Sequence, residues 1–353
     1  MSNTRGYIMK TVICSKVGSL KEQDETKRGR VEVIDVPEDI VGEEDVKIKV
    51  AYCAICGSDP HQIEGIFSED PPFGLGHEVS GTIVELGEKA IIKGLKVGDK
   101  VAGNFIHYCG TCYYCRNGQE QFCLNPIKKP CMSEYIVWNE SQVCKIPKEI
   151  SLAEACLLEP VSIVVRIVDK SNMKIGQRVL ISGGGPIGLL TLQAFKMNGA
   201  TSLTLVEPIE ERREMAKDFG ADYVLDPVNQ NIVAESETIT NGLGYDVVIE
   251  ASGSPNAATV AVDIAAKCGT ILYIAMFPKD YKMPLNLYNT GFERELTISS
   301  INVAPYAYPR ALQLLGRMNL EPFTHKVFTL DNVEDAFAAQ MTGKWPKILI
   351  QCN

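Results

Sequence analysis

The alternation of apolar and polar residues divides the chain into two kinds of region. Residues 31–50 and 78–103 carry alternating or β-branched apolar residues, as in Val46-Lys47-Ile48-Lys49-Val50, and glycines and Asp-Lys pairs separate these segments. This pattern predicts short strands with irregular connections. The first region is therefore expected to consist mostly of β-structure.

After about residue 165 short apolar segments alternate with amphipathic ones. The short segments predict strands at Arg178–Ser182, Leu203–Glu207, Tyr223–Leu225, Asp246–Glu250 and Thr270–Ala275. Apolar residues at helical spacing predict helices at Ile187–Asn198 and Glu210–Phe219. Strand–helix alternation of this kind predicts a parallel sheet covered on both faces.

The last fifty residues show a third pattern, with helices predicted at Pro309–Met318 and Val333–Met341 and a strand at Lys347–Gln351. We therefore expect a β-rich domain of residues 1–168 and 303–353, interrupted by an α/β domain of residues 169–302. No apolar run approaches the roughly 20 residues that a membrane span needs. The segment Met1–Lys10 lacks the apolar core of a signal peptide.

Composition narrows the possible functions. The 353 residues include 35 basic and 44 acidic side chains, and the net charge of −9 gives no support to nucleic-acid binding. The twelve cysteines are mostly scattered, which favours metal ligands and buried free thiols in a reducing compartment over disulfides. A cytoplasmic location is therefore expected.

A glycine-rich turn follows the first predicted strand of the α/β region. Gly183, Gly185 and Gly188 fit the pattern G-x-G-x-x-G, and Pro186 and Ile187 begin the helix after it. These glycines permit a tight turn, the approach of a pyrophosphate and close packing of the helix on the strand. The amides at the start of the helix face the phosphates. The segment predicts a dinucleotide site.

An acidic residue ends the second predicted strand of this region. Glu207 lies about 20 residues past the glycines, as the dinucleotide fingerprint requires. Its carboxylate would accept hydrogen bonds from both adenosine ribose hydroxyls and would repel a 2′-phosphate, which favours NAD over NADP. Arg212 is expected to line the adenosine pocket. Binding of a 2′-phosphate by Arg212 and Arg213, and a doubly wound sheet without a nucleotide, are the alternatives.

Four cysteines lie close together in the first region, at Cys109, Cys112, Cys115 and Cys123. Thiolates at the spacing C-x2-C-x2-C-x7-C can surround one Zn²⁺ without leaving an open position, so a structural zinc is expected in a lobe of about residues 107–125. Disulfides are an alternative, but the short spacings favour a metal. An iron–sulfur cluster is another, although its usual fourth-cysteine spacing differs.

Two motifs upstream of the four cysteines supply a second set of metal donors. Cys56 begins Cys-Gly-Ser-Asp-Pro-His, and His77 and Glu78 lie in Gly-His-Glu-Val-Ser-Gly. Glu159, before Pro160, is a fourth candidate. A catalytic zinc keeps three protein ligands and leaves a position for water or substrate. Taken singly, each residue also fits a plain structural role.

Taken together, the motifs resemble those of the zinc-dependent medium-chain dehydrogenase/reductase superfamily, and the resemblance covers nearly the whole chain. It is strongest to the polyol branch, that of sorbitol (L-iditol) 2-dehydrogenase, with threonine and 2,3-butanediol dehydrogenases nearby. Glu78 directly after His77, the pair Glu159-Pro160, and the tail segments Tyr308–Leu312 and Thr324-His325 carry this part of the resemblance.

The resemblance implies an α/β protein with a GroES-like, β-rich catalytic domain and a Rossmann domain with a doubly wound parallel sheet. It implies Cys56 and His77 as ligands of a catalytic zinc. Glu78 would be the third ligand, direct or through water, and Glu159 would exchange with water. Asp59 would orient His77 through the other ring nitrogen.

The resemblance also implies a proton relay. Ser58 would contact the substrate hydroxyl and pass its proton through the nicotinamide ribose to His61. Pro60 departs from the family pattern and puts the direction of the His61 side chain in doubt. Side chains expected to form the substrate pocket include Ile63, Phe67, Phe105, Tyr135 and Phe292.

The implied activity is the reversible, zinc-dependent oxidation of a secondary alcohol of a small-molecule polyol to a ketone, with hydride transfer to NAD. Two zinc ions per chain, one catalytic and one structural, and a homodimer or homotetramer are implied with it. A threonine or 2,3-butanediol dehydrogenase with the same machinery is the nearest alternative. A non-catalytic relative that binds NAD is a more distant one.

Overall fold

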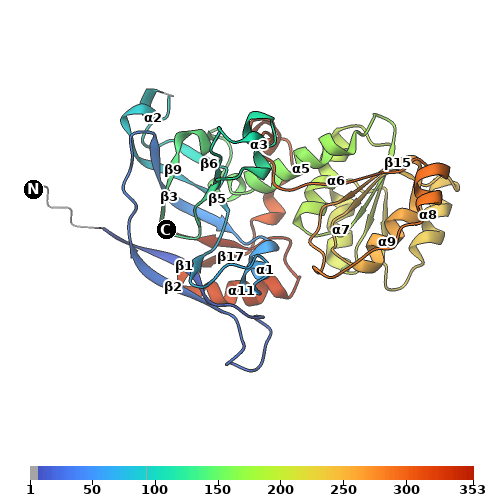
Figure 1. The fold of residues 1–353 in the computed structure, drawn as a ribbon, viewed down its shortest axis with the longest axis horizontal. Helices are drawn as coiled ribbons and strands as arrows, with labels where there is room; N and C mark the ends of the chain where they lie inside the picture. Colours follow the sequence, from blue (N-terminus) through green and yellow to red (C-terminus); the bar gives the residue numbers. More distant parts are fainter. Residues whose placement is uncertain (1–6, 93) are drawn as a thin grey trace, which may run out of the picture. The chain divides into compact units, whose positions relative to one another are not determined.

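The computed structural model describes residues 7–92 and 94–353, and it divides into two compact units. The first unit comprises Met1–Glu159 and Tyr308–Asn353, and the second comprises Pro160–Ala307 (Figure 1). The predicted domain boundary at 168/169 falls inside helix α5 (Leu158–Ser171), whereas the division lies near the start of that helix. In the described part of the chain, no helix has the length and apolarity to span a membrane.

The first unit is built mainly from strands. These are β1 (Ile8–Lys16), β2 (Arg30–Pro37), β3 (Asp45–Ala54), β4 (Phe73–Gly74), β5 (Glu78–Leu86), β6 (Lys100–Gly103), β7 (Ile106–His107), β8 (Ile127–Lys128), β9 (Tyr135–Asn139), β10 (Val143–Lys145), β17 (Val327–Thr329) and β18 (Leu349–Gln351). The largest sheet has the order β10-β6-β5-β3-β18-β17, with β9 also paired to β3. Smaller sheets are β2-β1-β4 and β7-β8. The prediction of a β-rich first region is confirmed.

Short helices connect these strands. They are α1 (Ser58–Ile63), α2 (Glu88–Ile92), α3 (Tyr113–Arg116), α4 (Leu152–Ala155), α10 (Tyr308–Leu315) and α11 (Val333–Met341). Helix α11 has the bounds predicted from the sequence. Helix α10 ends at Leu315 rather than at the predicted Met318.

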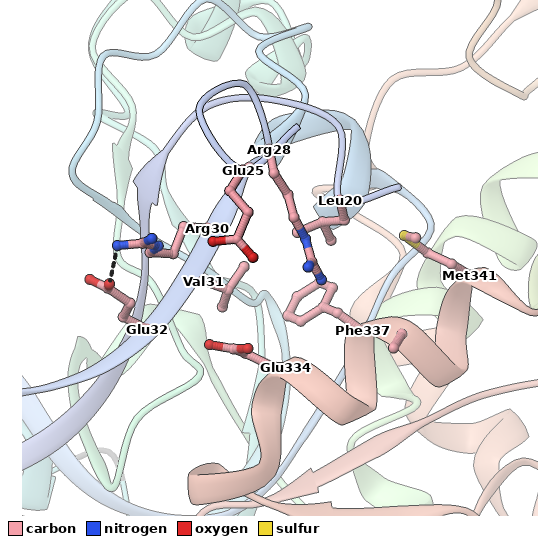
Figure 2. A pocket seen from close by; sticks show the side chains of 11 residues that line it. Leu20, Glu25, Arg28, Arg30, Val31, Glu32, Glu334, Phe337 and Met341 are labelled. Atoms are coloured by element: carbon pink, nitrogen blue, oxygen red, sulfur yellow. Dashed lines mark ion pairs between the residues drawn. The ribbon is translucent and has the colours of Figure 1, made fainter. Parts of the chain in front are cut away.

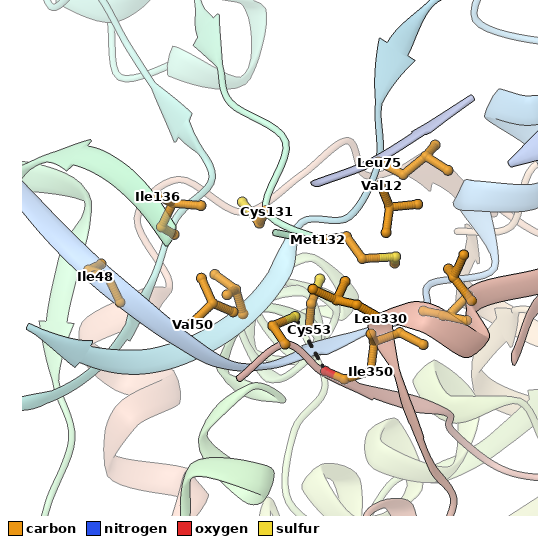
Figure 3. Packing of buried hydrophobic residues seen from close by; sticks show 14 of the residues in the cluster. Val12, Ile48, Val50, Cys53, Leu75, Cys131, Met132, Ile136, Leu330 and Ile350 are labelled. Carbon is orange, nitrogen blue, oxygen red and sulfur yellow. Dashed lines mark hydrogen bonds between the residues drawn. The ribbon is translucent and has the colours of Figure 1, made fainter. Parts of the chain in front are cut away.

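The alternating pattern of β3 explains how this unit forms a core. Val46, Ile48 and Val50 are buried, whereas Lys49 between them is exposed, because successive strand residues point to opposite faces. The carboxyl-terminal strand β18 pairs antiparallel with β3, so that Ile350 lies opposite Cys53 in the same cluster (Figure 3). The last residues of the chain are therefore part of the first unit's core.

The second unit contains a parallel sheet. Its strands are β11 (Arg178–Ser182), β12 (Ser202–Val206), β13 (Tyr223–Leu225), β14 (Tyr245–Glu250), β15 (Ala265–Tyr273) and β16 (Thr297–Ser300). Its helices besides α5 are α6 (Pro186–Met197), α7 (Glu210–Asp218), α8 (Ile232–Thr240) and α9 (Pro255–Ile264). The five predicted strands are confirmed, although β15 begins at Ala265 rather than Thr270.

The order of this sheet, β13-β12-β11-β14-β15-β16, shows that it is doubly wound. The direction of progression reverses between β11 and β14, and right-handed crossovers then place the helices of the two halves on opposite faces. Helix α6 accordingly packs against α7, and α8 packs against α9. In such sheets ligands bind beyond the carboxyl ends of the strands at the point of reversal.

A carboxylate network at the other end of the sheet joins β11 to β14. Asp246 accepts hydrogen bonds from Nε of Arg178 at 2.9 Å, from its Nη2 at 3.0 Å and from its backbone amide at 2.8 Å. Partial burial acts to raise the pKa of Asp246, but the hydrogen bonds and charge of Arg178 lower it overall.

We expect Asp246→Asn to lower the free energy of unfolding by about 1–2 kcal/mol at neutral pH, as measured by urea unfolding. Because the pKa is lowered in the folded state, the advantage of Asp246 is present above the ordinary aspartate pKa. It disappears as the pH falls through the folded-state pKa. A difference between the two proteins that persists undiminished in acid would contradict this assignment.

Candidate metal centres and dinucleotide pocket

The proposed catalytic zinc ligands come from the ends of two paired strands in the first unit. Cys56 follows β3, and His77 and Glu78 lie at the start of β5; the antiparallel register places Ala54 opposite Glu78. This pairing brings two distant motifs together. A sulfur atom of Cys56, a ring nitrogen of His77 and a carboxylate oxygen of Glu78 lie within 4.8 Å of one another. Sulfur, nitrogen and oxygen donors in this arrangement fit a zinc ion with an open position.

Asp59 holds two of these donors in place from a fully buried position. Its Oδ2 accepts a hydrogen bond from the Cys56 amide at 2.8 Å, and its Oδ1 lies 3.3 Å from Nδ1 of His77. Burial acts to lower the pKa of His77, but the charges of Asp59 and Cys56 raise it well above its ordinary value. With Asp59 on Nδ1, the Nε2 atom of His77 is the one left for a metal. The ring of Phe105 packs on that of His77, 5.1 Å away between centroids.

Lys347 is a residue of this centre that the sequence motifs did not reveal. Its side chain is 2% exposed, and its Nζ donates to Oε1 of Glu78 at 2.8 Å and to the carbonyl of Ile55 at 3.3 Å. Burial disfavours the charge on Lys347, yet the charge and hydrogen bond of Glu78 raise the pKa of the lysine above its ordinary value. The sequence offered only one signal, a lysine directly before the apolar residues Ile348–Ile350 of the terminal strand.

The surroundings of the second carboxylate oxygen of Glu78 show best whether a metal ion fits between these three residues. Glu78 is 1% exposed, and its Oε2 has no hydrogen-bond partner among the residues that the structure describes. A buried carboxylate oxygen without a partner is unfavourable unless a cation binds it. Because Lys347 holds Oε1, Oε2 is the atom that Glu78 offers to a metal.

Glu159, predicted as a fourth ligand, lies outside the group of three. It is at the start of α5 and buried, and it interacts electrostatically with His77 and Glu78. Burial raises the pKa of Glu159 to about 7, with a further contribution from Glu78, while His77 and Lys347 oppose the rise. It is therefore near the centre, and its exchange with water stays a prediction.

The two residues of the predicted relay lie on helix α1. Pro60 occupies the first turn, where the absence of a backbone N–H has no cost, so the helix forms despite this departure from the family pattern. Nδ1 of His61 lies 3.7 Å from Oε2 of Glu64. Among the described residues, no hydrogen bond joins Ser58 to His61, and the relay stays a prediction. Ile63, expected in the substrate pocket, is buried in the core cluster; that expectation was wrong.

The four-cysteine lobe brings its sulfur atoms together as expected. The Sγ atoms of Cys109, Cys112, Cys115 and Cys123 all lie within 4.8 Å of one another, and α3 carries Cys115. The amide of Cys109 donates to Sγ of Cys123 at 3.4 Å, and hydrogen bonds from Thr111 and Cys112 lower the pKa of Cys109 to about 5. All twelve cysteines are free. Four converging sulfurs that accept N–H donors fit a structural zinc.

The glycine-rich turn of the second unit has the geometry of a phosphate site. Gly183 has φ +105°, and a Cβ there would lie 2.9 Å from the Ser252 nitrogen. A Cβ on Gly188 would lie 1.9 Å from the Gly183 oxygen, so helix and strand could not pack. By contrast, no atom of the described residues lies within 4 Å of the Cβ position of Gly185, which leaves room for a ligand. Helix α6 begins at Pro186 and Ile187 beside this space.

A cavity of about 520 Å³ adjoins this turn and contains the predicted adenosine residues. Oε2 of Glu207 accepts from the Gly184 amide at 2.6 Å, and Oε1 accepts from the Ile209 amide at 2.9 Å. Arg212 also lines the cavity, with Nη1 3.9 Å from Oε2 of Glu207. Arg213 instead donates to the carbonyl of Glu207, so its role as a phosphate ligand finds no support.

A second cavity, of about 350 Å³, lies in the first unit between β2 and α11 (Figure 2). Its floor includes Val31 and Phe337, and its rim carries exposed charges. Arg30 and Glu32 on this rim form an ion pair with each other at 3.6 Å. The cavity contains none of the predicted site residues.

Comparison with known proteins places these features in a family. Residues 42–148 match the model of the alcohol dehydrogenase GroES-like domain, and residues 186–317 match that of the zinc-binding dehydrogenases. The chain is 36% identical to the L-threonine 3-dehydrogenase of Pyrococcus horikoshii over 90% of its length and 93% of that protein. It is 31% identical to a sorbitol dehydrogenase of Halalkalibacterium halodurans over 91% of its length and 96% of that protein.

A solved structure shows the same fold. A protein of the zinc-binding dehydrogenase type from Sinorhizobium meliloti, bound to NADP, superimposes with a TM-score of 0.89 at 28% identity, covering 98% of this chain and 99% of that one. The GroES-like and Rossmann architecture expected from the motifs is thereby confirmed. The chain belongs to the zinc-dependent medium-chain dehydrogenase/reductase family, and within it to the polyol branch.

Proposed function

We propose that this dehydrogenase oxidises a secondary alcohol of a polyol to a ketone, reversibly, with transfer of hydride to NAD. The observation that carries the proposal is the set of Cys56, His77 and the unpartnered Oε2 of Glu78, which leaves a fourth metal position for a hydroxyl. The same chain carries the cavity that contains Glu207 and the open face of Gly185. Oxidation of L-threonine is the second candidate, because a threonine dehydrogenase is 36% identical.

The site residues of the first unit would bind the metal, position its ligands and handle the proton. Cys56, His77 and Glu78 would hold Zn²⁺, which when bound supplies a Lewis acid that lowers the pKa of a substrate hydroxyl. Oδ1 of Asp59 lies 3.3 Å from Nδ1 of His77, and its Oδ2 accepts a hydrogen bond from the Cys56 amide, so Asp59 would keep both donors directed at one point. Ser58 would accept a hydrogen bond from the substrate hydroxyl, and His61, half exposed on α1, would hold the released proton close to solvent.

The residues of the second unit would bind the coenzyme, which itself supplies the hydride acceptor. The pyrophosphate would lie over Gly185 at the start of α6, where Pro186 and Ile187 begin the helix. Glu207, whose carboxylate is already held by two backbone amides, would accept hydrogen bonds from the adenosine ribose hydroxyls. Arg212 would lie beside the adenosine.

A preference for NAD is a specific prediction, since one solved relative is bound to NADP. Glu207 would repel a 2′-phosphate, whereas Arg212 beside it would attract one once the carboxylate is gone. We expect Glu207→Ser to reduce the NAD/NADP ratio of kcat/KM by about a hundredfold, roughly 2.7 kcal/mol. Steady-state kinetics with both coenzymes measures this ratio. An unchanged ratio would show that Glu207 does not select the coenzyme.

The substrate is tested by following NAD⁺ reduction with sorbitol, xylitol, galactitol, inositols, L-threonine and 2,3-butanediol. The proposal expects the highest kcat/KM for a polyol. A higher value for L-threonine would select the second candidate. Absence of turnover with every secondary alcohol, in protein with both metal sites filled, would contradict both.

We also propose that the chain forms a homodimer or homotetramer in a reducing cytoplasm. Strand β16 is the last strand at one edge of the parallel sheet, and an open edge favours pairing with another chain. Leu287 is 77% exposed. Next to it in the sequence, the exposed rings of Tyr288 and Phe292 stack on each other, with 5.5 Å between their centroids. Twelve free thiols are typical of a reducing compartment. A monomer in light scattering would contradict the assembly.

A further inference from the structure

Glu250 is a buried carboxylate in the second unit to which the proposed mechanism gives no role. It ends β14, at the carboxyl edge of the sheet beside the point where the strand order reverses, and it is 0% exposed. Among the described residues, no lysine or arginine forms an ion pair with it. Burial raises the pKa of Glu250, against the effect of its hydrogen bonds. A buried carboxylate without a cation is costly, so its place needs a reason.

The carboxylate organises the turn that follows it. Oε1 accepts hydrogen bonds from the amide of Ser252 at 2.9 Å and from its hydroxyl, and Oε2 accepts from the amide of Gly253 at 3.2 Å. The hydroxyl of Ser252 in turn accepts from the amide of Ser254 at 3.2 Å, and Ser254 caps helix α9. One carboxylate therefore holds Ser252 and Gly253 directly and, through the Ser252 hydroxyl, the amide of Ser254 at the start of α9.

This turn forms one wall of the dinucleotide cavity. Ala251, Ser252 and Ser254 line the cavity together with Gly183 and Glu207. The turn also touches the glycine-rich loop, since a Cβ on Gly183 would lie 2.9 Å from the Ser252 nitrogen and 3.0 Å from the Ala251 carbonyl carbon. A shift of the turn would therefore alter both the wall that faces Glu207 and the support of the phosphate loop.

We propose that Glu250 is a positioning residue of the dinucleotide site, which holds the Ala251–Gly253 turn against Gly183 so that the adenosine half of the coenzyme meets a preformed cavity. The proposal rests on the proposed function, because it presumes that a dinucleotide binds here. Pre-organisation of this kind lowers the cost of ordering the site on binding. No contact between Glu250 and the coenzyme is required.

The test compares two carboxamide variants of the same strand. Glu250→Gln keeps the size of the side chain but places an NH2 group, which cannot accept, opposite a backbone amide. Asp246→Asn is the matched control, because it breaks the carboxylate network with Arg178 at the far end of β14, outside the cavity. We expect Glu250→Gln to raise the Kd of NADH and of ADP about tenfold in calorimetric titration. Asp246→Asn should change both by less than about twofold, whatever its effect on stability.

A steady-state readout separates positioning from general damage. Glu250→Gln should raise the KM for NAD⁺ and leave the KM for the alcohol and the zinc content unchanged. If Glu250→Gln does not fold, Glu250→Asp replaces it in the test, because it retracts the carboxylate by one methylene. This variant should likewise raise the Kd of NADH and the KM for NAD⁺. Wild-type affinity in a folded Glu250 variant, or equal losses in Asp246→Asn, would overturn the proposal. Failure of the wild type to bind NADH or NADPH would instead overturn the proposed function.

Discussion

Replacing Cys56 by alanine is expected to reduce NAD⁺ reduction by about a thousandfold or more, while NADH binding survives. The variant removes one of the three donors whose atoms lie within 4.8 Å of one another, and with it the stabilisation of several kcal/mol that a metal gives to a reacting oxygen. The coenzyme cavity is formed by residues of the second unit, so its affinity should not depend on this thiol. Turnover assays and NADH fluorescence titration measure the two quantities separately.

The matched control for this variant is Cys268→Ser. Cys268 is an exposed free thiol outside both proposed metal sites, so its loss should leave turnover and zinc content unchanged. His77→Ala should behave as Cys56→Ala does. Undiminished activity in either variant would show that Cys56 and His77 are not ligands of a catalytic zinc.

Lys347→Met is expected to destabilise the protein by about 3–5 kcal/mol, because it leaves the buried Oε1 of Glu78 without the ammonium group that donates to it. Urea unfolding of the two proteins measures the difference. We expect zinc affinity to change as well, since Glu78 is then free to rotate and offer either oxygen. Titration with Co²⁺, whose visible spectrum reports coordination, follows this second effect.

Two controls separate the pair from the loss of a lysine as such. Lys347→Met combined with Glu78→Gln removes both charges and should recover most of the lost stability. Lys10→Met removes a lysine from an exposed ion pair with Asp331 of nearly the same length, 2.7 Å, and should change stability little. A Lys347→Met protein as stable as wild type would show that the buried pair does not support the fold.

Much of the architecture was predictable because it depends on local patterns. The strands Arg178–Ser182 and Tyr223–Leu225 and the helix Val333–Met341 have the bounds expected from hydrophobic periodicity. Gly183 and Gly188 were identified from spacing alone, and the structure gives each a steric reason. Such features arise from neighbours in sequence, which pattern analysis reads directly.

The missed residues act through contacts that no local pattern reveals. Lys347 meets Glu78 across 269 positions of sequence, only because the terminal strand β18 pairs with β3. Glu250 ended a predicted strand, and its three donors come from a turn whose shape the sequence does not specify. Ile63 was expected in the substrate pocket, whereas helix α1 places its side chain in the core.

We expect each chain to hold two zinc ions with different roles, one catalytic and one structural. Elemental analysis of the purified wild type, Cys56→Ala and Cys268→Ser proteins tests it most directly. We predict two zinc ions per chain in the wild type and in Cys268→Ser, and one in Cys56→Ala, which keeps the four-cysteine site while losing turnover. A single zinc in the wild type, or two in an inactive Cys56→Ala protein, would contradict the claim.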